Sequence, residues 1–233
     1  MAEELRMQII ARVHSDFSTK FGVPRQSSLV EELKSTLVFE PEFRDENALR
    51  GIEQFSHLWL IWQFSENANA GWSPTVRPPR LGGNLRLGVF ATRSPFRPNP
   101  IGLSAVRLEG VETHPRLGPV LHIACADLMD GTPILDIKPY IPYADAHPEA
   151  APGYTAQTRL HALNVDFPDA LLDRVPPDKR AALRGVLAQD PRPSYQDDPK
   201  RVYGFGFAGR EIRFRVSGEV LTVVDVTDAK PEI

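Results

Sequence analysis

The sequence has little cysteine and no long apolar run. Its single cysteine, Cys125, lies in the apolar segment 120–126, which excludes an internal disulfide and predicts a buried, unreactive thiol. No apolar run approaches the roughly 18 residues that a membrane-spanning helix needs. The first residues, Met1 to Arg6, have neither the basic start nor the apolar core of a signal peptide. We therefore expect a cytoplasmic protein with no membrane partner.

Several common enzymatic motifs are also missing. The chain has no Gly-x-Gly-x-x-Gly after a strand, no Gly-x-x-x-x-Gly-Lys-Ser/Thr phosphate loop and no Gly-x-Ser-x-Gly nucleophile elbow. The six histidines lack close metal-ligand spacing, and there is no second thiol to help bind a metal. These absences argue against a Rossmann-type nucleotide enzyme and against a metal site.

Acidic residues are absent from the window 67–108, which contains six arginines. They are Arg77, Arg80, Arg86, Arg93, Arg97 and Arg107. Because the whole chain of 233 residues has a formal net charge of −3, the part outside this window carries −9. Charge sorted in this way favours a polyanionic partner. The alternative is that the arginines pair with carboxylates elsewhere in the fold, and composition does not decide between the two.

The first part of the chain has the pattern of a β protein. Segments rich in β-branched and aromatic residues alternate with Pro and Gly turns, at a spacing typical of all-β barrels or sandwiches. The expected strands are 7–13, 37–39, 57–64, 87–92, 101–111, 120–128 and 134–140. One helix is expected near 44–54, with Asp45 as its cap. We therefore expect a mainly β domain over residues 1–145.

The pattern changes after a polar bridge near 145–153. Segments 167–175 and 178–188 have the apolar spacing of amphipathic helices. Three expected strands follow, at 202–207, 211–216 and 220–226, separated by short glycine turns. We expect residues 146–233 to form a smaller α+β domain, with helices followed by a three-strand meander.

Two loop segments, which carry arginines of the acid-free window, are candidates for binding. The connection 65–85 has no periodicity and carries Trp72 and two arginines, and loops of this length inside a domain tend to be functional or disordered. The segment 92–102 follows, and its three prolines lower the entropy cost of holding Arg93, Arg97 and Asn99 in place. Arginine forks suit phosphate, carboxylate or a base edge. The alternative for the second segment is a proline-rich turn with its arginines in water.

A second polar cluster lies further along the chain. Asp130-Gly131 between two apolar strands is a strong hairpin signal, so turn geometry alone accounts for Asp130. Asp136 and Lys138 are two apart in an expected strand and therefore on one face, together with Ile134 and Tyr140. This predicts a polar site at the side or mouth of the sheet, and an exposed salt bridge is the alternative. The residue pattern by itself indicates a β protein that handles RNA or nucleotides.

Six blocks of sequence then occur in a recognisable order over most of the chain. They are 23–26 (Val-Pro-Arg-Gln), 57–59 (His-Leu-Trp), 76–84, 88–104, 127–143 and 187–195. In these blocks the chain resembles the TsaA-like family, and within it the bacterial TrmO-type tRNA (adenine-N6)-methyltransferases. The resemblance implies an S-adenosylmethionine enzyme built on a single-sheet β-barrel, acting as a homodimer. Its expected substrate is N6 of the threonylcarbamoyl-modified adenine at position 37, in the anticodon stem-loop of threonine tRNA.

The same resemblance assigns the cofactor contacts. They are Pro24, Arg25, Gln26, His57, Leu58, Arg93, Leu103, Asp130, Gly131, Thr132 and Pro133. The chain departs from the family at Ser27-Ser28, where relatives often have Pro-Gly after the Pro-Arg-Gln loop. This departure leaves the local geometry of the loop open.

For the reaction itself, we expect Asp136 to accept the proton that N6 sheds, with Lys138 and Tyr140 orienting the site. The expected RNA contacts are Arg77, Arg80, Arg97 and Asn99. Two alternatives remain, a noncatalytic RNA-binding β-barrel and an S-adenosylmethionine enzyme that methylates a small molecule.

Overall fold

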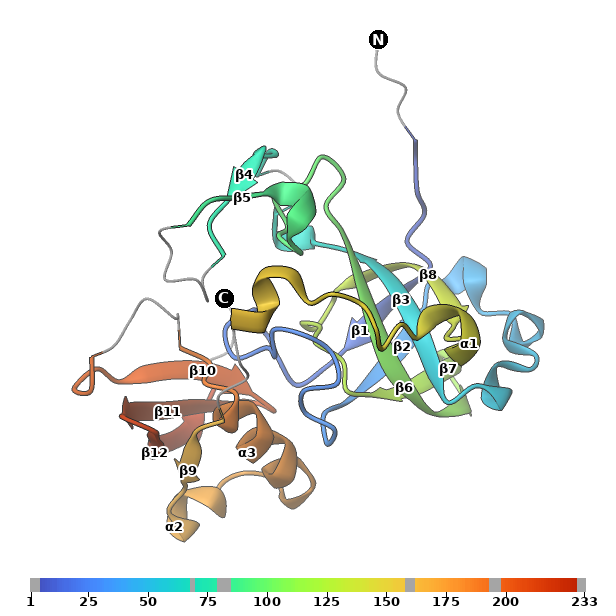
Figure 1. Cartoon of the computed structure of the whole chain (residues 1–233). Coiled ribbons are helices and arrows are strands. Elements are labelled where there is room, and N and C mark those ends of the chain that lie inside the picture. Colours follow the sequence, from blue (N-terminus) through green and yellow to red (C-terminus); the bar gives the residue numbers. More distant parts are fainter. Residues whose placement is uncertain (1–4, 68–69, 79–84, 158–161, 193–197, 230–233) are drawn as a thin grey trace.

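The computed structural model describes residues 5–67, 70–78, 85–157, 162–192 and 198–229. It contains two main sheets (Figure 1), and each sheet has its own core of buried residues. The strands are β1 Ala11–His14, β2 Lys34–Phe39, β3 His57–Gln63, β4 Thr75–Val76, β5 Leu87–Gly88, β6 Ile101–His114, β7 Gly118–Ala124, β8 Pro133–Pro139, β9 Asn164–Asp166, β10 Tyr203–Phe207, β11 Arg210–Ser217 and β12 Val220–Asp228. The α-helices are α1 Pro142–Asp145, α2 Asp169–Leu172 and α3 Arg180–Ala188. Short 3-10 helices are Pro41–Phe43, Glu46–Leu49, Ile52–Gln54, Ser65–Asn67, Val89–Ala91, Gly153–Gln157 and Pro177–Lys179.

The first main sheet is antiparallel and closes on itself. Its strand order is β1-β2-β7-β6-β3-β8, and β8 pairs back with β1 to form a barrel. Inward side chains such as Val13, Leu37 and Leu60 are fully buried, while their neighbours along each strand point outward, because successive side chains of a strand alternate between faces. The expectation of a mainly β chain is confirmed.

Strand β8 contains an irregularity that changes which side chains face the core. Opposite β3, Ile61 pairs with Asp136 but Trp62 pairs with Ile134, so Leu135 is an extra residue. Ile134 and Ile137 consequently both contact the barrel core, although they are three apart in sequence. The prediction that Ile134 shares a face with Asp136 is therefore wrong, because a bulge breaks the period-two alternation.

The second main sheet is covered on one side by helices α2 and α3 (Figure 1). Its order is β10-β11-β12-β9, with β9 parallel to β12, so the expected three-strand meander is present but gains a fourth strand. The helix expected at 167–175 is reduced to α2, and the helix expected at 178–188 begins as the 3-10 turn Pro177–Lys179 before α3. Leu183 and Leu187 of α3 are fully buried, at the helical spacing that the sequence predicts.

A segment between β1 and β2 joins the second core. Phe17 is buried there with its ring centroid 5.3 Å from that of Phe207. Lys179 Nζ lies 2.7 Å from Asp16 Oδ2, which ties the helical region to the same segment. At Gly22, where φ is +96°, an added Cβ would lie 2.3 Å from the Phe205 ring. The loop that follows, 23–26, is thus held between the two sheets.

Three local expectations need correction. The helix expected near 44–54 is replaced by two 3-10 turns, although Asp45 does cap the first by accepting from Asn47 N at 2.9 Å. The strand expected at 87–92 ends at Gly88. Asp130-Gly131 forms a turn, but not a hairpin, because β7 and β8 are not neighbours in the sheet.

Within the described residues, no helix combines the length and the apolar character needed to cross a membrane.

Candidate functional site

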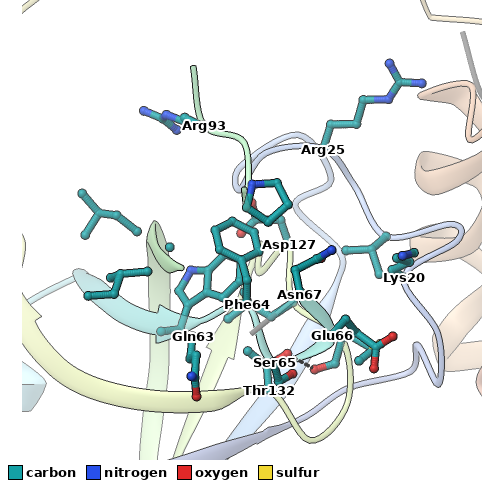
Figure 2. Close-up of a pocket in the computed structure, with 18 of the residues that line it drawn as sticks. Lys20, Arg25, Gln63, Phe64, Ser65, Glu66, Asn67, Arg93, Asp127 and Thr132 are labelled. Carbon is teal, nitrogen blue, oxygen red and sulfur yellow. Dashed lines mark hydrogen bonds between the residues drawn. The ribbon is translucent and has the colours of Figure 1, made fainter. Parts of the chain in front are cut away.

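A pocket of about 470 Å³ opens at the end of the barrel where β3 ends and β6 begins. Its walls come from five places: Lys20 with the loop Val23–Gln26, the segment Trp62–Asn67, the residues Thr92, Arg93, Pro95 and Arg97, the start of β6 at Ile101–Leu103, and the connection after β7 with Asp127–Met129 and Thr132. Figure 2 shows Arg25 and Arg93 at one rim and Glu66 and Thr132 at the opposite side. Segments far apart in sequence therefore converge on one cavity.

The loop 23–26 is fixed by backbone hydrogen bonds from the residues that follow it. Ser28 N donates to Cys125 O at 3.0 Å, and Cys125 N donates to Leu33 O at 2.8 Å. Ser28 has φ of +65° and Cys125 has φ of +67°, a left-handed conformation that favours glycine. Ser28 therefore adopts the geometry suited to the glycine of the family pattern. Cys125 is buried, as predicted, and burial raises the pKa of its thiol.

Two groups of predicted cofactor residues come together at the rim. Arg93 Nη1 donates to Gln26 Oε1, which joins the loop 23–26 to the proline-rich segment 92–97. Arg25 Nη2 donates to Arg192 O at 2.9 Å, so the same loop also contacts the chain after α3. Both Arg25 and Arg93 are exposed and line the pocket. They place positive charge where an anionic group of a ligand can reach it.

One wall of the pocket is apolar and was not predicted. Trp62 and Phe64 lie with ring centroids 4.3 Å apart. The Trp62 indole covers Gly102, where an added Cβ would come within 2.2 Å of the ring. Leu103, which the resemblance did assign, follows on β6 and is 51% exposed. The sequence signal for Trp62 and Phe64 was only that an apolar strand runs into a loop at this point.

Asp127 is a carboxylate of the pocket that the sequence did not single out. Its Oδ1 accepts from Ser104 Oγ at 2.6 Å, and Ser104 Oγ in turn accepts from Trp62 Nε1 at 3.0 Å. Burial raises the pKa of Asp127, while the Ser104 hydrogen bond and the positive charge of Arg93 oppose that rise. A half-buried carboxylate held on a side-chain hydrogen-bond chain is a candidate for binding or proton transfer.

Of the block 130–133, only Thr132 lines the pocket. Thr132 is buried, and its Oγ1 donates to Met129 O at 2.7 Å. Asp130 instead accepts from Ser15 N at 3.0 Å and lies 3.5 Å from His14 Nδ1. Gly131 provides the turn with φ of +75°, and Pro133 begins β8. Asp130, Gly131 and Pro133 therefore shape the connection between β7 and β8 and do not line the pocket.

His57 and Leu58 lie at the other end of β3 from the pocket. Leu58 is fully buried in the barrel core, and His57 Nδ1 lies 2.9 Å from Ser56 Oγ. The residues of β3 that reach the pocket are Trp62 and Gln63. His57 and Leu58, which the resemblance assigned as cofactor contacts, therefore do not line the pocket. The pocket residues of β3 lie at its carboxyl end.

The predicted catalytic residues lie on the outside of the barrel. Lys138 Nζ is 2.8 Å from Asp136 Oδ2, with the two side chains 62% and 42% exposed. Tyr140 packs beside Trp59, with ring centroids 5.4 Å apart. None of Asp136, Lys138 and Tyr140 lines the pocket. The exposed salt bridge accounts for the charged pair, and the bulge in β8 is the reason that the expected polar face does not form at the site.

A larger groove, of about 1770 Å³, adjoins the pocket and shares the loop 23–26 and Arg93 with it. Segments of both halves of the chain form its walls, including 73–78, 90–96, 151–155 and 189–192. Its described lining contains six cationic side chains and a single carboxylate, Asp190. The six are Lys20, Arg25, Arg77, Arg86, Arg93 and Arg192. The groove thus offers a polyanion an excess of positive charge next to the pocket.

The residues predicted to contact RNA divide in the structure. Arg77 lines the groove. Arg97 donates to Val89 O at 3.1 Å and to Thr92 O at 2.6 Å, so its guanidinium holds the 3-10 turn Val89–Ala91. Asn99 is exposed and lines neither cavity, and Arg80 lies outside the described residues. Phe90 and Phe96, which are 74% and 39% exposed, add aromatic surface to the groove.

In the part of the chain that the structure describes, no group of three or more His, Cys, Asp or Glu side chains is arranged to hold a metal ion.

Comparison with known proteins gives consistent matches over both halves. A model of the tRNA-methyltransferase O N-terminal domain matches residues 12–146, and one of the TrmO C-terminal domain matches residues 158–229. The tRNA (adenine(37)-N6)-methyltransferase of Escherichia coli is 41% identical over 216 residues, 89% of this chain and 92% of the relative. That of Eikenella corrodens is 52% identical over 163 residues, 70% of this chain and 91% of the relative.

A Pseudomonas aeruginosa relative, named a putative S-adenosylmethionine-dependent methyltransferase, is 43% identical over 203 residues, 84% of this chain and 85% of the relative. A crystal structure of TrmO from the same species has a TM-score of 0.79 and 33% identity, covering 98% of this chain and 99% of that one.

Proposed function

The chain belongs to the TrmO family, and from this premise we propose that it transfers a methyl group from S-adenosylmethionine to N6 of adenine 37 in tRNA. The observation that carries the proposal is the convergence of Gln26, Arg93, Leu103 and Thr132 on one pocket beside a groove lined with arginines. The pocket has a volume in the usual range for small-ligand sites.

The pocket residues fit the chemistry of S-adenosylmethionine. Arg25 and Arg93 suit its carboxylate, and the Trp62, Phe64 and Leu103 wall suits its adenine and methylene groups. Glu66 supplies negative charge near a ligand that carries an ammonium and a sulfonium. When bound, S-adenosylmethionine supplies an electrophilic methyl group, and the protein contributes mainly by holding the two reactants in line.

We assign RNA binding to the groove. Arg77 keeps the role predicted from the sequence, and Arg86 joins it, since both line the groove. Arg97 and Asn99 are not retained as RNA contacts, because Arg97 donates to backbone carbonyls and Asn99 lies outside the groove. Exposed Phe90 and Phe96 suit stacking on unpaired bases of an anticodon loop. A cationic groove that leads into the methyl-donor pocket lets one adenine enter while the surrounding phosphates stay paired with arginine.

We also propose the finer points of the function. The substrate nucleoside is the threonylcarbamoyl-modified adenosine of threonine tRNA, and the enzyme works in the cytoplasm as a homodimer. Residues 1–145 provide the cofactor pocket, and residues 146–233 complete the groove. The proposal for the second part is supported by Tyr154, Val186 and Arg192, which line the groove.

Calorimetric titration with S-adenosylmethionine tests the pocket and separates an enzyme from a noncatalytic RNA-binding module. We expect the parent protein to bind, and Arg93→Ala to bind about tenfold more weakly or worse, because it removes a charge-assisted hydrogen bond to the ligand. Arg116→Ala is the matched control, since Arg116 is exposed in the turn between β6 and β7. Absence of binding by the parent would contradict the proposed function.

A further inference from the structure

Among the described residues, two carboxylates line the methyl-donor pocket, Asp127 and Glu66. Glu66 is exposed, whereas Asp127 is half-buried beneath the apolar wall. A carboxylate that acts on a proton during the reaction needs a fixed position and partial exclusion of water. Asp127 meets both conditions, whereas Asp136 lies on the barrel exterior, outside the pocket, and is paired with Lys138.

The position of Asp127 is set by two side chains from two strands, Trp62 of β3 and Ser104 of β6. Trp62 Nε1 at the end of β3 donates to Ser104 Oγ of β6 at 3.0 Å. Ser104 Oγ donates to Asp127 Oδ1 at 2.6 Å. Ser104 is 1% exposed, so water does not compete for this chain of hydrogen bonds. The same indole forms part of the pocket wall, which couples the shape of the site to the carboxylate.

We propose that Asp127 is the catalytic residue that accepts the proton released from N6 of the adenine, with Ser104 and Trp62 as positioning residues. This inference rests on the proposed function. The N6–methyl bond forms as the methyl–sulfonium bond breaks, and the electron pair of the second bond stays on sulfur. The N6–H proton passes to the Asp127 carboxylate and then to solvent, so atoms and charge balance.

The surroundings of Asp127 suit a proton acceptor. Burial raises the pKa of its carboxyl, which makes the carboxylate a better base, and the Ser104 hydrogen bond opposes that rise. The charged groups that line the same pocket are Lys20, Arg25, Glu66, Arg93 and Arg97, and of these Arg93 favours the ionised form of Asp127. The hydroxyl of Ser104 engages Oδ1, which directs the acceptor geometry of the group.

Asp127→Asn tests the proposal because the amide preserves shape but not basicity. We expect the maximal rate of methyl transfer, measured with saturating S-adenosylmethionine and tRNA, to fall about 100-fold or more. The dissociation constants of both ligands, measured by calorimetry and filter binding, should change by less than about threefold. Asp136→Asn is the matched control and should keep the parental rate, since Asp136 is paired with Lys138 outside the pocket.

Ser104→Ala gives a second readout that a purely structural role would not move. Asp127 must be ionised to accept a proton, and the Ser104 hydrogen bond lowers its pKa. Loss of that bond raises the pKa, so activity should begin to fall at a higher pH as the solution is acidified. The acid limb of the rate profile is therefore expected to shift upward in Ser104→Ala.

Two results would overturn the inference. One is an Asp127→Asn variant that transfers methyl groups at a rate close to that of the parent. The other is a loss that disappears at saturating S-adenosylmethionine, which would make Asp127 a binding residue for the ammonium group. A parent protein that itself fails to methylate tRNA would instead contradict the proposed function, so the two failures are distinguishable.

Discussion

At the scale of single residues, the site depends on a few backbone positions that the sequence marks only faintly. Ser28 has φ of +65° and donates its backbone N–H to Cys125 O, which anchors the loop 23–26 at the pocket. Left-handed geometry costs a residue with a Cβ about 1–2 kcal/mol. Ser28 therefore anchors the loop at a cost in backbone strain.

Ser28→Gly should raise the free energy of unfolding by about 0.5–1 kcal/mol, because relief of strain outweighs the extra entropy of glycine in the unfolded chain. Denaturant unfolding measures the change. Ser27→Gly is the matched control, since Ser27 has no positive φ and should gain nothing from glycine. Equal effects at the two positions would contradict the assigned strain.

At the scale of secondary-structure elements, strand β3 and the start of β6 place the apolar wall. Trp62 pairs with Gly102 across these strands, and the glycine leaves space for the indole. The indole then reaches Ser104 and, through it, Asp127. A glycine in a strand often marks such a close approach.

Gly102→Ala should displace the Trp62 indole, because the new Cβ would lie within 2.2 Å of the ring. We expect a loss of about 1–3 kcal/mol in stability from overpacking, together with weaker binding of S-adenosylmethionine. Gly110→Ala on the same strand is the matched control, since no atom lies within 4 Å of its added Cβ. Thermal unfolding measures the change in stability, and calorimetry measures the binding of S-adenosylmethionine. A Gly102→Ala protein that binds S-adenosylmethionine like the parent would show that the indole does not form the wall.

The element scale also shows what the sequence predicts well and where it fails. Alternation of apolar residues located most strands, because one face of each strand is buried. It failed at β8, where the extra residue Leu135 shifts Ile137 toward the core and leaves Asp136 outside. The resemblance located Gln26, Arg93, Leu103 and Thr132 in the pocket, but Asp127 and Trp62 emerge only when β3, β6 and the connection after β7 are brought together. Long-range contacts of this kind have no local signature.

At the scale of the whole molecule, the two halves are joined through the segment after β1. Phe17 lies in the core of the second sheet, Lys179 pairs with Asp16, and Arg25 contacts the chain after α3. The loop that lines the pocket is therefore packed against both sheets. Because residues of both halves line the groove, we expect docking of RNA to engage the whole chain rather than the barrel alone.

The central claim is that this chain methylates N6 of adenine 37, with the RNA lying in the arginine-lined groove. The most direct measurement is mass spectrometry of nucleosides from threonine tRNA. The tRNA comes from a strain in which the gene for this protein is deleted, and it is analysed before and after incubation with the protein and S-adenosylmethionine. The account predicts one added methyl group at adenine 37. It also predicts that the double variant Arg77→Ala/Arg86→Ala forms the same product, with a higher KM for tRNA and a weaker salt dependence of tRNA binding. The control variant Arg213→Ala/Arg215→Ala, on the exposed face of β11, should behave like the parent. A tRNA whose position 37 gains no methyl group from the parent protein would contradict the account.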